Sequence, residues 1–153
     1  MNSCVEISKI NLIHNIRELQ KVIGEKVILS PAIKGNAYGH GLEICAQTMI
    51  DCGIKYLSVF SIDDLKRLRQ INKQVNVLLL GYMPWEELDE TCYTNTIFSI
   101  FNLEGLDNIG KISKKINKKV DIHVKLETGF NRFGIGEKEI TKFLEILKKY
   151  PLL

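Results

Sequence analysis

Residues 27–41 read VILSPAIKGNAYGHG and join a β-prone apolar run to a glycine-rich loop. The run from Val27 to Ile33 predicts a strand, and Lys34 follows where that strand should end. In α/β proteins, an apolar strand followed by a polar loop and an amphipathic helix presents reactive groups at the carboxyl edge of the sheet. We therefore expect Lys34 to stand at the carboxyl edge of a parallel sheet.

The loop after Lys34 contains residue types that suit a ligand-binding site. A lysine that follows a buried strand often only marks where the chain meets water. Here three glycines allow a ligand to approach the backbone closely, and Tyr38 and His40 add hydrogen-bonding groups. Partial desolvation by the strand would disfavour the ammonium form, which is what a Schiff-base amine requires. The pattern favours a reactive amine over an ordinary surface lysine.

The segment PAIKGNAYGHG resembles the pattern with which alanine racemases and related serine racemases bind pyridoxal 5'-phosphate (PLP), A-[VI]-[VI]-K-A-[DN]-A-Y-G-H-G. It differs at Gly35, where alanine is commoner, and in the pair Pro31-Ala32. Neither difference changes a reactive group. The resemblance implies that Lys34 forms the internal aldimine with PLP and that Tyr38 hydrogen-bonds the phosphate of the cofactor.

A second constellation occupies residues 120–136, VDIHVKLETGFNRFGIG. The alternating run predicts a strand that delivers Lys125 near its carboxyl end, and a polar loop with Arg132 follows. Lys125 and Glu127 could be a simple surface ion pair, which contributes only about 0–1 kcal/mol. In a barrel, however, strand ends on the same face converge on one site, so Lys34 and Arg132 could meet.

This stretch resembles a second racemase pattern, H-x-K-[VL]-[DE]-T-G-M-x-R-x-G, about 90 residues after the first. Glu127 replaces the commoner aspartate and Phe130 the commoner methionine. The resemblance implies that Arg132 contacts the phenolic oxygen of PLP and the substrate carboxylate, which a planar guanidinium can bind at two points. It also implies that Lys125 is often carbamylated; without that modification, Glu127 is the candidate acid to offset the two cations.

Strand-helix units recur about every 20 to 25 residues along the chain. Strands joined through helices run parallel, so either a doubly wound open sheet or part of a (β/α)8 barrel fits. An intact barrel takes about 250 residues. We expect an α/β fold, a partial (β/α)8 TIM-type barrel with about five parallel strands. The resemblance implies that residues 1–153 are the N-terminal part of the PLP-binding barrel, without the remaining strands and the C-terminal β-domain.

Composition excludes several other classes of protein. The chain has 153 residues, 45% of them apolar and 25% charged, with a net charge of +3, as in globular proteins. The basic run KISKKINKK alternates with isoleucines at helical spacing, which predicts a solvated helix face and no nucleic-acid binding. Apolar runs stay well below the roughly 20 residues that span a bilayer. The four cysteines lack metal-ligand spacing, so we expect a cytoplasmic protein with no metal site.

The resemblance implies an amino-acid racemase that interconverts L- and D-alanine for cell-wall precursors. It also implies that this racemase acts as a homodimer. Racemisation requires two bases, one on each face of the substrate. By resemblance, Lys34 serves one face and a tyrosine from the partner's C-terminal domain the other, so we expect this portion alone to be inactive. A serine or broad-specificity racemase, a non-catalytic PLP-binding protein and an interaction scaffold remain as alternatives.

Overall fold

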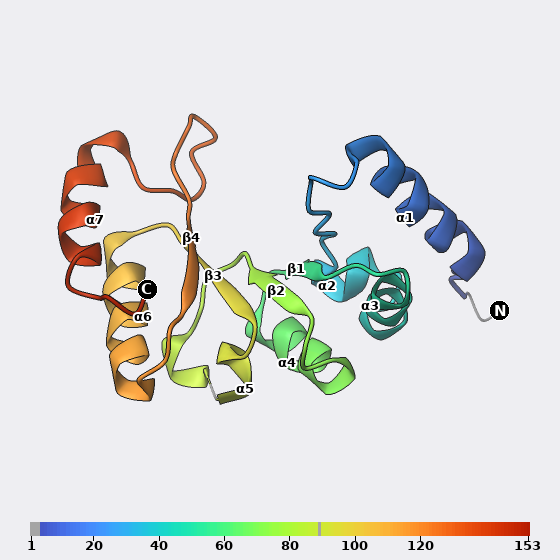
Figure 1. Ribbon diagram of the computed structural model, residues 1–153, viewed down its shortest axis with the longest axis horizontal. Coiled ribbons are helices and arrows are strands. Elements are labelled where there is room, and N and C mark those ends of the chain that lie inside the picture. The colour runs from blue at the N-terminus through green and yellow to red at the C-terminus, as the bar shows by residue number, and fades with distance from the viewer. Residues whose placement is uncertain (1–3, 89) are drawn as a thin grey trace. The chain divides into compact units, whose positions relative to one another are not determined.

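The computed structural model describes residues 4–88 and 90–153. The chain forms two compact units, Met1–Asn95 and Thr96–Leu153. The first unit contains the following elements, labelled in Figure 1: α1 (Lys9–Ile23), α2 (Lys34–Tyr38), α3 (Leu42–Asp51), β1 (Tyr56–Val59), α4 (Ile62–Ile71), β2 (Asn76–Leu79), the 3-10 helix η1 (Trp85–Glu87) and α5 (Glu90–Tyr93). The second contains β3 (Thr96–Ile100), α6 (Leu103–Ile116), β4 (Asp121–Val124), the 3-10 helix η2 (Glu137–Glu139) and α7 (Ile140–Leu147).

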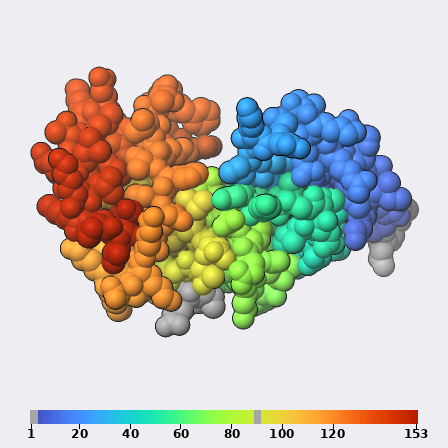
Figure 2. Space-filling view, in the orientation of Figure 1, coloured from blue at the N-terminus to red at the C-terminus, as the bar shows by residue number. Residues whose placement is uncertain are grey.

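Helix α1 begins and ends on local signals that the sequence carries. The Ser8 side chain accepts a hydrogen bond from the Asn11 amide at 3.3 Å, which caps the first turn. Gly24 ends the helix with a φ of 72°, a conformation that glycine adopts without steric cost. Ile16 is buried, and Figure 2 shows the atoms of α1 (blue) lying against those of α3 (green-blue).

The segment expected to be the first strand forms only a short parallel bridge. Ala32 pairs with Ser58 of β1, while residues 24–31 have no regular structure. The Ser58 amide donates to the Pro31 carbonyl and the Ile33 amide donates to the Ser58 carbonyl, both at 2.9 Å. Pro31 has no amide hydrogen of its own, which limits the pairing that this segment can form. Lys34 still follows a chain segment that runs parallel to β1.

Strands β1 and β2 form a parallel pair in the core of the first unit. Their register runs from Tyr56 opposite Asn76 to Val59 opposite Leu79. Helix α4 connects them, and its first turn is capped by Ser61, which accepts a hydrogen bond from the Asp64 amide at 3.1 Å. The residues that are completely buried between these elements are Leu57, Val59, Leu65, Leu68, Val77 and Leu79.

The second unit repeats this organisation. Strands β3 and β4 pair in parallel, with Ile97 opposite Asp121. Helix α6 connects them and lies beside α7 in Figure 1. Tyr150 packs against Gly110 of α6 so closely that a Cβ at that glycine would overlap the ring, and the Tyr150 hydroxyl donates to the Asp107 carboxylate. The end of the chain is thereby held against α6.

The predicted α/β class is confirmed, because parallel strands alternate with helices in both units. Four strands form within residues 4–88 and 90–153, where about five were expected, the difference being the bridge at Ala32. Among the described residues, no helix is both long enough and apolar enough to cross a membrane. In each unit, the loops that carry the predicted site residues follow the carboxyl ends of the parallel strands.

Candidate functional site

Lys34 lies at the carboxyl end of the first unit's parallel segments. Ile33, which is 1% exposed, holds the backbone against β1, and Lys34 is half-buried. The Lys34 amine lies 5.6 Å from the centre of the ring of Phe60, the residue that directly follows β1. An ammonium group over an aromatic face is attracted by the ring quadrupole. The lysine is therefore directed along the end of β1.

Gly81, which follows β2, packs closely against the backbone and the ring of Phe60. A Cβ built at Gly81 would overlap the Phe60 carbonyl oxygen and lie 2.9 Å from its ring. Nearby, the Leu80 amide donates to the Val59 carbonyl at 2.8 Å, which draws the two strand ends together. Only a glycine fits between these strand ends, and the position of the Phe60 ring beneath the lysine depends on it.

We expect Gly81→Ala to lower the free energy of unfolding by about 2 kcal/mol, because the added methyl group overpacks a closed contact. Urea denaturation measures this change. Gly136→Ala is the matched control, since a Cβ there meets only the Glu139 carboxylate at 3.5 Å; we expect it to change the free energy by less than about 0.5 kcal/mol. Equal effects of the two substitutions would contradict the packing role of Gly81.

The four residues after Lys34 form a left-handed turn. Gly35, Asn36, Ala37 and Tyr38 have φ angles of 60°, 56°, 53° and 55°. This conformation costs an ordinary L-residue roughly 1–2 kcal/mol. The turn is closed by the Gly39 amide, which donates to the Gly35 carbonyl at 3.2 Å. A run of three non-glycine residues in this region must be held by its surroundings.

Two side chains of the glycine-rich loop hydrogen-bond within it or to the start of α3, and a third is exposed. The Asn36 side-chain oxygen accepts from the Leu42 amide at 3.0 Å and so tethers the turn to the start of α3. A His40 ring nitrogen, Nδ1, hydrogen-bonds the Ala37 carbonyl at 2.8 Å, so this atom is the protonated one and Nε2 is left available. Tyr38 is 64% exposed, which leaves its ring accessible to a ligand.

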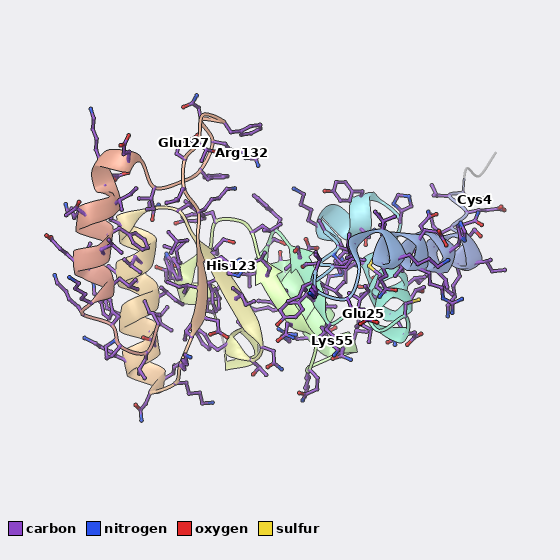
Figure 3. All side chains as sticks on the ribbon, turned by 45° about the horizontal axis from the view of Figure 1, so that its top comes forward. Cys4, Glu25, Lys55, His123, Glu127 and Arg132 are labelled. Atoms are coloured by element: carbon purple, nitrogen blue, oxygen red, sulfur yellow. The ribbon has the colours of Figure 1, made fainter. Side chains whose placement is uncertain are left out.

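The second unit gathers Lys125 and Arg132 around one small pocket of about 130 Å³. The Lys125 amine lies 5.9 Å from the Phe133 ring centre, and the Arg132 guanidinium lies 4.7 Å from that of Phe130. Figure 3 shows Arg132 on the loop that follows β4, beyond His123 of the strand. Each cation thus has an aromatic face beside it on this loop.

The base of this loop is closed by backbone contacts around Lys125. The Lys125 amide donates to the Ile100 carbonyl, and the Ile135 amide donates to the Lys125 carbonyl, both at 2.8 Å. A Cβ at Gly134 would overlap the Glu127 amide nitrogen, so the two arms of the loop approach too closely for another residue there. The loop leaves and returns beside the same strand end.

Glu127 organises the loop between these arms. Its carboxylate accepts from the Gly129 amide at 2.6 Å and from the Asn131 amide at 3.0 Å. The amide of Asn131, followed by that of Gly129, lowers the pKa of Glu127 below its ordinary value of 4.5. Within the described residues, Glu127 forms no ion pair with Lys125 or Arg132, although it lines the same pocket. Its carboxylate binds backbone amides in the place where the sequence suggested a counter-charge.

We expect the loop contacts of Glu127 to be lost in acid. Because the folded-state pKa lies below that of the unfolded chain, the contribution is complete above about pH 4.5 and disappears as the pH falls through the lower, folded value. The amide proton shifts of Gly129 and Asn131, followed by NMR, should titrate below pH 4.5. Glu127→Gln should abolish the titration; a midpoint at or above the ordinary value would contradict this assignment.

The structure distributes the predicted site residues over both units. Lys34 and Tyr38 belong to the first, and Lys125 and Arg132 share a pocket in the second. That the Lys34 amine and the Arg132 guanidinium meet in one site stays a prediction. Sequence reasoning missed Phe60 as a neighbour of Lys34; its only signal was its place as the last residue of a short β-prone run, residues 56–60.

A separate cavity of about 770 Å³ lies at the other end of the first unit's strands. It is lined by the end of α1, by residues 24, 25 and 27–29 and by residues 53–56, and none of the predicted site residues lines it. Two of its labelled residues, Glu25 and Lys55, can be followed in Figure 3. Val27 and Ile28 line this cavity and are 56% and 65% exposed. The predicted chemistry and this cavity therefore occupy different parts of the unit.

Comparison with known families accounts for the presence of both motif-bearing loops in one chain. The family model described as "Alanine racemase, N-terminal domain" matches residues 7–153. The chain belongs to this family. The predicted family is thereby confirmed, and both motif-bearing loops lie within the matched region.

Two curated members of the family are close enough to align over most of the chain. Alanine racemase 2 of Caldanaerobacter subterraneus subsp. tengcongensis is 33% identical over 147 residues, which cover 93% of this chain and 38% of that protein. The alanine racemase of Carboxydothermus hydrogenoformans is 32% identical over 143 residues, covering 94% of this chain and 39% of that protein. The chain thus spans about two fifths of the length of these relatives.

Solved racemase structures share the fold. The alanine racemase of Bacillus anthracis with bound L-Ala-P superposes with a TM-score of 0.83 at 26% identity, over 95% of this chain and 38% of that chain. The alanine racemase of Clostridium difficile 630 gives a TM-score of 0.82 at 27% identity, over 93% of this chain and 37% of that chain. These similarities support the predicted partial barrel.

Proposed function

We propose that this chain provides the lysine-bearing part of a PLP-dependent alanine racemase. The observation that carries the proposal is the Lys34 amine, half-buried over the Phe60 ring at the carboxyl end of parallel segments and within a racemase motif. A primary amine held at a strand end beside a glycine-rich loop suits capture of an aldehyde. Bound PLP supplies an electron sink that makes the α-proton of an amino acid acidic.

The residues of the two loops fit the groups of such a cofactor and its substrate. Lys34 would hold PLP through its amine, and the same amine, when free, would exchange a proton with the substrate's α-carbon on one face. The exposed Tyr38 would donate its hydroxyl to the phosphate. Arg132, which stays charged at any working pH, would bind the phenolic oxygen and the substrate carboxylate. Lys125 lines the same pocket as Arg132 and would be the position of carbamylation that the resemblance implies.

Alanine is the substrate that the comparisons favour. The two curated relatives are named alanine racemases, and the Bacillus anthracis structure contains L-Ala-P. We extend this substrate to the present chain as a proposal, in preference to serine or a broader set of amino acids. The reaction would interconvert L- and D-alanine, with the protein acting in the cytoplasm.

We also propose that a complete site needs more than the present 153 residues. Racemisation requires a base on each face of the substrate, and Lys34 supplies only one. The second base would be supplied by polypeptide other than these residues, in the homodimer that the resemblance implies. The purified chain should therefore not turn over alanine; measurable racemisation would refute this point, and sedimentation would test self-association.

Reductive trapping tests the proposed cofactor site. The chain is mixed with PLP, reduced with borohydride and digested, and the labelled lysines are identified by mass spectrometry. We expect the label to concentrate on Lys34. Labelling spread evenly over the exposed lysines would refute the proposal and favour an interaction scaffold. Selective labelling without turnover in any assembled form would instead favour a non-catalytic PLP-binding protein.

A further inference from the structure

The left-handed turn after Lys34 is anchored by side chains of α3 and α4. The Gly35 amide donates to the Asp64 carboxylate at 3.4 Å, and the Arg67 guanidinium donates to the Asn36 side-chain oxygen at 3.0 Å. Both acid and arginine come from α4, one helical turn apart, so they face the loop together. Gly35 and Asn36 are the first two residues of the strained turn.

Arg67 is itself fixed by acids on both sides. Its Nε donates to one Glu43 oxygen at 2.8 Å and its Nη2 to the other at 2.9 Å, a bidentate pair with α3. Its Nη1 lies 3.9 Å from the Asp64 carboxylate, whose residue is 8% exposed. A planar guanidinium can make these contacts and still reach Asn36, whereas a lysine amine provides a single point of attachment.

The geometry points to Arg67 as a positioning residue for Lys34, acting through Asn36. This inference rests on the function proposed above for Lys34. The lysine has the bridge at Ala32 on one side and the left-handed turn on the other. Because three residues of the turn occupy a conformation that L-residues disfavour, the turn should relax when its anchor is removed. The direction in which Lys34 leaves the strand would then change.

Hydrogen exchange measures the anchor itself. In the 153-residue chain, Arg67→Met should raise amide exchange in residues 34–42 by about tenfold while leaving α1 unchanged, because only a local contact is lost. Lys21→Met is the matched control: it removes an exposed ion pair of the same unit, between Lys21 and Glu18 of α1 at 2.6 Å, which involves neither α4 nor the turn. Unchanged exchange in residues 34–42 of Arg67→Met would overturn the inference.

Reductive PLP labelling then measures the consequence for Lys34. Arg67→Met should slow selective labelling of Lys34 about tenfold or more, since small displacements of a reacting group have large effects on rate. Arg67→Lys should recover part of this loss, and the control Lys21→Met should leave the labelling rate of Lys34 at the wild-type value. Labelling of Lys34 at the wild-type rate despite faster exchange in the turn would overturn the inference.

A double-mutant cycle separates positioning from general stability. Asn36→Gly removes the side-chain contact while permitting the left-handed backbone. If Arg67 acts through Asn36, adding Arg67→Met to this variant should slow labelling no further; additive losses would overturn the inference. The wild-type arm tests the proposed function separately: absence of selective labelling at Lys34 there refutes that function, and the role of Arg67 toward the lysine falls with it.

Discussion

Lys34→Arg is expected to abolish selective capture of PLP. The guanidinium remains protonated at any working pH and has no free electron pair for attack on the aldehyde, whereas a lysine amine can form the C=N bond with loss of water. The substitution keeps the positive charge and can keep the contact with the Phe60 ring. The folded structure should therefore persist while labelling of this position falls to background, at least about 100-fold below wild type.

Lys55→Arg is the control for this prediction. Lys55 is an exposed residue just before β1, at the cavity remote from the predicted chemistry. Its replacement should leave the labelling of Lys34 unchanged. If Lys34→Arg retains the total label, now spread over other lysines with similar rates, then PLP binding does not depend on this amine and the proposed site is wrong.

The order of elements could be read from the sequence because it depends on local patterns. Apolar residues recur at helical spacing in α6 and α7, and a serine, Ser61, caps the first turn of α4 with its own side chain. The segment 27–33 was harder to predict, since β-prone residues do not by themselves supply a hydrogen-bonding neighbour. Pairing there reduced to the contacts around Ser58.

The features of the candidate site that depend on local sequence could also be predicted, whereas those set by distant residues could not. The motifs identified Lys34 and Arg132 by residue type and spacing. The left-handed turn after Lys34 could not be predicted, because Asn36 and its neighbours adopt a backbone that their own preferences disfavour and that Arg67, 31 residues away, helps to hold. Glu127 shows the same limit: its type suggested a counter-charge, whereas loop geometry directed its carboxylate to backbone amides.

Arg69→Met is expected to destabilise the first unit more than any exposed substitution in it. Arg69 is 4% exposed and donates to the Val75 carbonyl at 2.8 Å and to the Asn95 carbonyl at 3.0 Å. Burial lowers the pKa of Arg69 to about 10, so the group still carries its charge at neutral pH. Removing it takes the side-chain donor from the buried Val75 carbonyl and leaves the Asn95 carbonyl with the Val77 amide at 2.9 Å, and an unpaired buried acceptor costs roughly 1–3 kcal/mol.

We expect Arg69→Met to lower the free energy of unfolding by about 3 kcal/mol and the urea midpoint by roughly 1–2 M. Arg69→Lys should lie in between, because one amine cannot serve carbonyls on both sides. Arg17→Met, at an exposed position of α1, should remain within about 0.5 kcal/mol of wild type. A loss below about 1 kcal/mol for Arg69→Met would mean that water replaces the guanidinium at these carbonyls, and that the link between the start of β2 and Asn95 does not depend on this side chain.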